Sequence, residues 1–147
     1  MFSFEAWWQI LTTKLPVFFQ GVGTTVELAL YTAIFGTLLG IVVALLRMSK
    51  VKLLKVLAGA YIEFLRGTPL LVQVLIVFYG LPQMGIKLPR MTAGTVALVI
   101  NSAAYMAEIV RSGIQAIDGG QTEASRSLGM NGFQTMIYII LPQAIKN

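Results

Sequence analysis

Residues 22–46 read VGTTVELALYTAIFGTLLGIVVALL, and this stretch decides the fold class. Tyrosine aside, its only ionisable side chain is Glu27. The stretch exceeds the roughly 20 apolar residues with which a helix crosses the hydrocarbon core of a bilayer. Gly36 and Gly40 form a small-xxx-small pattern, which lets a neighbouring helix approach closely. The stretch therefore predicts a membrane-spanning helix packed against another helix.

The residues on either side of this span predict its orientation. Four basic residues follow it with no acidic residue among them: Arg47, Lys50, Lys52 and Lys55. Lysine and arginine accumulate in cytoplasmic loops, so we expect this loop to be cytoplasmic and the N-terminus extracytoplasmic. Aromatic residues precede the span: Trp7, Trp8, Phe18 and Phe19. They indicate either a segment lying at the membrane interface, where such rings are enriched, or simple packing between helices.

Residues 57–81 predict a second span, which contains charged residues and a proline. Glu63 and Arg66 are three residues apart, so they share a helix face and can pair. Pro69 favours a kink just before it. Charges within a membrane helix are costly and generally face the protein interior or a watery cavity. The two charges therefore either line a transport path or hinge, or form a structural ion pair near the inner interface.

Residues 91–110 predict a third span with one polar face. Asn101, Tyr105 and Glu108 follow an i, i+4, i+7 pattern. In lipid such a face must turn towards protein or water. Asn101 and Glu108 thus join Glu63 and Arg66 as candidates for a translocation path. The alternative is hydrogen bonding between helices without any ligand.

Composition supports a membrane protein and excludes several chemistries. Hydrophobic residues make up 56% of the chain and mean hydropathy is +0.78, whereas charged residues make up 12%. Soluble domains usually carry about 25% charged residues. There is no cysteine or histidine, and no P-loop motif that would cradle ATP phosphates. We expect a single all-α polytopic membrane domain over residues 1–147, with no catalysis, cofactor or metal. The net charge of +5 lies at the ends of apolar segments, which argues against a nucleic-acid partner.

A polar segment after the third span predicts two short helices joined by a tight turn. Thr122 is a plausible N-cap for the first helix, and Gly129 is placed to end it in a left-handed conformation. Asn131 can cap the second helix, which Pro142 would end or kink. The second helix has an apolar stripe: Phe133, Met136, Ile137 and Ile140. Such an elbow can transmit force between a cytoplasmic partner and the spans.

Three motifs resemble one family. The pattern Glu-Ala-Ser-x3-Gly-x9-Ile-x-Leu-Pro, residues 123–142, resembles the EAA loop of ABC importer permeases, although Ser125 replaces the usual second alanine. Residues 61–73, YIEFLRGTPLLVQ, and residues 104–114, AYMAEIVRSGI, resemble the polar amino acid uptake branch. The likeness covers nearly the whole chain from about Gly21.

The resemblance implies a function and partners. The chain would be the membrane-spanning permease subunit of an ATP-driven amino acid importer in the bacterial inner membrane. A second permease subunit, identical or not, would complete the pore. A separate ATPase subunit would supply the energy, and an extracytoplasmic binding protein would deliver the amino acid. The resemblance places the ATPase-coupling role on five residues: Glu123, Ala124, Gly129, Leu141 and Pro142.

Members of the family continue beyond their EAA loop through two more membrane helices. The resemblance therefore implies a permease domain that is incomplete at its C-terminus. One alternative is therefore a non-transporting remnant or accessory that binds only the ATPase or a partner permease. A second alternative, in which the EAA spacing is a coincidence, is a transporter driven by an ion gradient. The sequence does not identify the amino acid that is transported.

Overall fold

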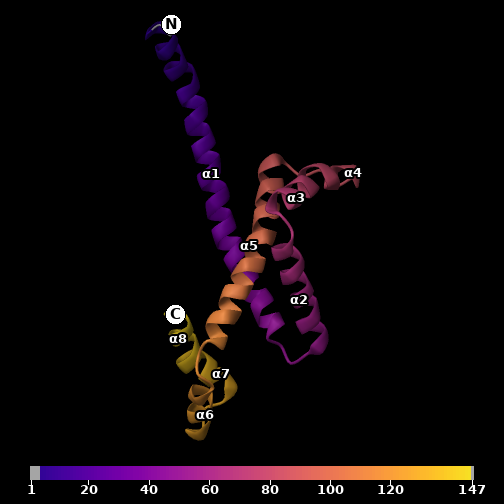
Figure 1. The fold of residues 1–147 in the computed structure, drawn as a ribbon, viewed down its shortest axis with the longest axis vertical. Coiled ribbons are helices and arrows are strands. Elements are labelled where there is room, and N and C mark those ends of the chain that lie inside the picture. Colours follow the sequence, from indigo (N-terminus) through magenta and orange to yellow (C-terminus); the bar gives the residue numbers. More distant parts are fainter. Residues whose placement is uncertain (1–3, 147) are drawn as a thin grey trace.

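The computed structural model describes residues 4–146, which form helices joined by short turns and contain no strand (Figure 1). This confirms the predicted all-α class. The longer helices are α1 (Phe4–Arg47), α2 (Lys52–Gly67), α5 (Arg90–Gln115) and α6 (Gly119–Ser127). The shorter helices are α3 (Leu70–Leu75), α4 (Leu81–Gln83), α7 (Gly132–Thr135) and α8 (Leu141–Ala144). Two π-helical segments are η1 (Ile76–Gly80) and η2 (Met136–Ile140).

Helices α1 and α5 cross closely and form the centre of the fold (Figure 1). Both are long and apolar enough to span a membrane. A methyl group added at Gly36 would lie 2.8 Å from Ser102 Oγ, and one added at Gly40 would lie 2.6 Å from Met106 Cβ. Alanines that are fully inaccessible to solvent complete the contact: Ala44, Ala103, Ala104 and Ala107. The predicted role of the glycine pair is confirmed, because these small residues let the two backbones approach.

Helix α1 is longer than the predicted span. It begins at Phe4, passes through Pro16 without ending, and continues to Arg47. Its 44 residues correspond to about 66 Å at 1.5 Å per residue, roughly twice the thickness of a bilayer's hydrocarbon core. The aromatic rings of Trp8, Phe18 and Phe19 are exposed. Both interpretations given above for these rings therefore remain predictions.

The second predicted span is bent far more sharply than a proline kink. Helix α2 ends at Gly67, and the segment from Leu70 to Gln83 leaves it at 104° (Figure 1). Thr68 is extended, and its hydroxyl donates to the carbonyl of Phe64. The buried side chain of Gln73 donates to Leu65 O and to Thr68 Oγ1, each at 2.8 Å. These bonds satisfy the carbonyls at the end of α2, so the chain turns at a stable corner.

Each π-helical segment is followed by the same three residues, Leu-Pro-Gln. The N–H of Leu81 bonds to Ile76 O, and the N–H of Leu141 bonds to Met136 O, each five residues back. A proline has no N–H and its ring crowds the preceding turn, so one widened turn accommodates it. Pro142 was expected to end or kink its helix. Instead the helix passes through η2 and continues as α8.

Candidate functional site

A row of polar side chains on α5 faces α2 and α3, and we call it the polar column. At one level Asn101 Nδ2 donates to Gln73 Oε1 at 3.1 Å. One turn along, the Arg66 guanidinium lies over the ring of Tyr105, 5.5 Å from its centroid. Arg66 also lies 3.9 Å from Glu108. The polar face predicted for α5 is therefore turned towards protein, as a membrane environment requires.

Glu108 is the centre of the charged end of the column. It forms a two-pronged pair with Arg111, one turn further along α5, and Arg111 also donates to Gln115. Two guanidiniums thus share one carboxylate, and this end of the column carries a net positive charge. The Arg66 side chain is 41% exposed, so its charge is accessible to a ligand or to water.

Glu63 lies apart from the column. Its carboxylate is 3.4 Å from the guanidinium of Arg47 at the end of α1, and its side chain is 77% exposed. The predicted pairing of Glu63 with Arg66 is wrong, because Arg66 turns towards Glu108 on α5. The structure therefore brings together Arg66, Asn101 and Glu108 but not Glu63.

Gln73 is a member of the column that sequence reasoning missed as a site residue. It is buried, and it joins the corner of α2 to Asn101 on α5. One signal was available: it is the only polar residue between Leu70 and Phe78. A polar side chain within so apolar a run indicates a specific hydrogen-bonding partner.

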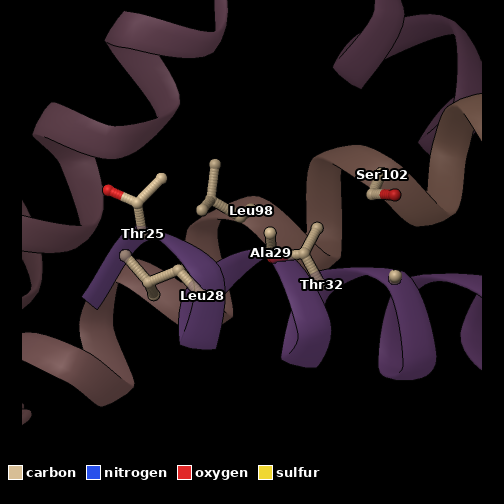
Figure 2. Close-up of a pocket in the computed structure, with 7 residues that line it drawn as sticks. Thr25, Leu28, Ala29, Thr32, Leu98 and Ser102 are labelled. Carbon is tan, nitrogen blue, oxygen red and sulfur yellow. The ribbon is translucent and has the colours of Figure 1, made fainter. Parts of the chain in front are cut away.

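A groove between α1 and α5 borders the crossing of these helices, with a volume of about 490 Å³. Figure 2 shows side chains of both helices along it, Thr25, Leu28, Ala29 and Thr32 from α1 and Leu98 and Ser102 from α5. Its lining is mainly apolar, with a few hydroxyls. Within residues 4–146, Thr32 Oγ1 is buried without a hydrogen-bond partner.

The elbow after α5, residues 116–144, begins with a different cap from the one predicted. Asp118, not Thr122, is the N-cap of α6: its carboxylate accepts from Gly120 N–H at 2.6 Å. Aspartate in this position satisfies a free N–H and suits the helix dipole. Thr122 and Glu123 consequently lie within α6.

The turn between α6 and α7 agrees with the sequence prediction. Gly129 has φ of +83°, the left-handed conformation that commonly ends a helix. Asn131 caps α7 in a reciprocal pair with Gln134, with both hydrogen bonds at 2.9 Å. The role of Gly129 as a helix stop and the cap by Asn131 are confirmed.

A hydroxyl pair holds the two arms of the elbow together. Ser125 on α6 and Thr135 on α7 are each 3% exposed, and their oxygens are 3.0 Å apart. The predicted apolar stripe is only partly buried: Ile140 is 5% exposed, but Phe133 is 75% exposed and Ile137 39%. The contact face of the second arm therefore runs through Thr135 and Ile140.

The elbow returns to α5 through α8. The carbonyl of Ala144 would be 3.4 Å from a methyl group added at Gly113 of α5. Four of the five residues named for coupling are exposed: Glu123, Ala124, Gly129 and Pro142. Beside them Leu128 is 83% exposed, a large apolar side chain at the tip of the elbow. Figure 1 shows α6 and α7 beyond the C-terminal end of α5 and α8 beside that end.

Comparisons with known proteins give consistent matches. Residues 36–147 match the family described as "Binding-protein-dependent transport system inner membrane component". The chain is 43% identical over 145 residues to the probable amino-acid ABC transporter permease protein YckA of Bacillus subtilis (strain 168), covering 95% of this chain and 64% of that protein. It is 42% identical over 135 residues to the arginine transport system permease protein ArtQ of the same strain, covering 91% of this chain and 62% of that protein.

A solved structure also matches. A chain of the "Crystal structure of an amino acid ABC transporter with histidines" is 47% identical, with a TM-score of 0.88. The match covers 99% of this chain and 66% of that one. This chain therefore spans a little under two-thirds of the length of each of these three proteins.

Proposed function

The chain belongs to the family of inner-membrane components of binding-protein-dependent transport systems, and we propose that it acts as the permease subunit of an ATP-driven amino acid importer. The relatives named for amino acid transport support the substrate class. The observation that carries the proposal is the elbow, whose short exposed helix α6 packs against a second arm that returns to α5 through α8.

In this proposal α6 is the element that contacts a separate ATPase subunit. Glu123 and Ala124 lie on its exposed surface, and Gly129 sets the angle at which the chain turns back. Leu141 and Pro142 belong to the return arm that leads to α8 and α5. A push on α6 passes through the Ser125–Thr135 pair to the second arm and from there to α5. In this proposal the chain needs no ATP site of its own, because the separate ATPase subunit supplies the energy.

The polar column is the proposed translocation path within this chain. An amino acid carries a carboxylate and an ammonium group, and the half-exposed guanidinium of Arg66 is a suitable partner for the carboxylate. Asn101 and Glu108 provide further polar contacts on the same face of α5. The exposed carboxylate of Glu63 remains a proposed contact for the ammonium group at the edge of the path.

The remaining proposals concern assembly and orientation. We expect a second permease subunit, identical or not, and an extracytoplasmic amino-acid-binding protein. The basic residues between α1 and α2 support a cytoplasmic position for that loop and for the elbow, with the N-terminus outside. The large exposed apolar surface of α1 supports contact with lipid or with further helices.

The test is capture of this chain, in detergent, by the amino-acid-uptake ATPase subunits of its own organism. We expect wild type to be captured and Glu123→Lys to be lost, because the substitution reverses a charge on the exposed face of α6. Met84→Lys is the matched control, since it places the same side chain at a position 77% exposed at the far end of α5. Equal capture of both variants would contradict the proposed contact.

A further inference from the structure

A basic pocket lies where α1 ends, α2 begins and α5 nears its end. It has a volume of about 350 Å³ and is lined by Arg47, Met48, Lys55, Arg111 and Gln115. The two candidate spans end at Arg47 and Gln115, so the pocket lies at the level where spans meet water. The pocket shares Arg111 with the charged end of the polar column, but Arg47, Met48 and Lys55 belong to neither the column nor the elbow.

The guanidinium of Arg47 is held in position at the mouth of this pocket. It donates to the carbonyl of Lys55 at 3.1 Å and pairs with Glu63 at 3.4 Å. It also fills the space beside Gly59, where a methyl group would collide with it. Arg47 is therefore fixed on α2 by three independent contacts, and its charge is presented without further ordering.

The opposite wall is held in the same way. Arg111 is bound by Glu108 and Gln115 and is 28% exposed. Lys55 is exposed and, within residues 4–146, forms no ion pair. Three cations and two contacting carboxylates leave an excess of one positive charge in the pocket. The pocket is thus suited to an anion.

Exposed apolar side chains lie within two residues of the pocket's lining on all three helices. Leu45 on α1 is 58% exposed, Val56 on α2 is 54% exposed, and Ile109 on α5 is 62% exposed. A ligand seated here meets cations at the membrane boundary and an apolar surface within the membrane. Basic pockets between membrane helices are known to hold the headgroups of anionic lipids. We infer that this pocket binds the phosphodiester headgroup of an anionic phospholipid, whose acyl chains lie along the neighbouring helices.

This inference rests on the membrane family of the chain and not on its coupling to an ATPase. A protein carboxylate would satisfy the cations but would leave the exposed apolar surface of the spanning helices uncovered. A lipid satisfies both features with one molecule. Lipid in this position would tie the ends of α1, α2 and α5 to the membrane surface.

The test is native mass spectrometry of the full 147-residue chain, released from micelles with equimolar phosphatidylglycerol and phosphatidylcholine. We expect wild type to retain phosphatidylglycerol preferentially. Lys55→Gln should lower this retention about fivefold, because a lysine that contacts an anionic headgroup contributes a factor of about that size. Lys52→Gln is the matched control: it removes a lysine of the same helix that does not line the pocket, and should change retention little.

Four results would overturn the inference. The first is equal retention of the two lipids by wild type. The second is an equal loss of phosphatidylglycerol retention in Lys52→Gln and Lys55→Gln, which would indicate diffuse surface charge. The third is displacement of phosphatidylglycerol by excess inorganic phosphate, which would indicate a site for free anions. If the ATPase subunit displaces the lipid instead, and Lys55→Gln weakens ATPase capture, the pocket is a protein contact. Lipid retention by Glu123→Lys would show that this site and the coupling contact are separate.

Discussion

The hydroxyl pair in the elbow gives the most detailed prediction. Ser125 Oγ donates to the carbonyl of Thr122 at 2.9 Å, so its single proton is used. The Thr135 hydroxyl, 3.0 Å away, must then be the donor to Ser125. Ser125→Ala would leave this buried donor without an acceptor, which costs about 1–3 kcal/mol. The better helix propensity of alanine offsets about 0.5 kcal/mol. We expect the elbow to lose about 0.5–2.5 kcal/mol of local stability.

Amide hydrogen exchange of residues 119–135 in detergent measures this loss. A change of 1.4 kcal/mol corresponds to a tenfold faster exchange. Adding Thr135→Val to Ser125→Ala removes the orphaned donor, so the double variant should be more stable than Ser125→Ala alone. Ser127→Ala is the control, because it makes the same change at an exposed position of α6. Unchanged exchange in Ser125→Ala, or additive losses in the double variant, would refute the reasoning.

Three further substitutions test other features. Gly40→Leu should lower the free energy of unfolding of the detergent-solubilised chain by about 3 kcal/mol or more, because the larger side chain forces α1 and α5 apart. Gly21→Leu is the control, because a methyl group added at Gly21 meets nothing within 4 Å, and equal losses in the two variants would contradict the crossing. Asn131→Ala removes the cap of α7 and should cost about 1 kcal/mol, seen as faster exchange of the first amides of α7; unchanged exchange would mean that the cap contributes nothing. Gly129→Ala places a residue with a side chain in a left-handed conformation and should destabilise the elbow by about 1 kcal/mol. Gly119→Ala in α6 should not destabilise it, and a larger loss in Gly119→Ala than in Gly129→Ala would contradict the turn.

The features that depend on nearby residues were predictable from sequence. The apolar run at 22–46, the glycines at Gly36 and Gly40, and the turn at Gly129 followed from helix periodicity, backbone sterics and the length of the run. The polar face of α5 was predictable for the same reason, since its residues share one helix.

The features that depend on contacts between distant segments were not predictable from sequence. In the sequence, Glu63 and Arg66 lie on one helix and can pair. In the structure, Glu63 pairs with Arg47 of α1, and Arg66 turns towards Glu108 of α5. The 104° corner needs Gln73 to bond the end of α2, and the proline alone predicts only a kink. The prediction of Thr122 as the cap was a local error, since Asp118, an aspartate before two glycines, is an equally good helix start.

Cysteine crosslinking at the tip of the elbow tests the central claim most directly. The chain contains no cysteine, so a single one can be introduced without background. Leu128 is 83% exposed beside Gly129, and Met84 is 77% exposed at the other end of the fold. With the chain and its ATPase subunit together, we expect Leu128→Cys to crosslink to the ATPase and Met84→Cys not to do so. Crosslinking from Met84→Cys, or capture of the ATPase without any crosslink from Leu128→Cys, would contradict the account.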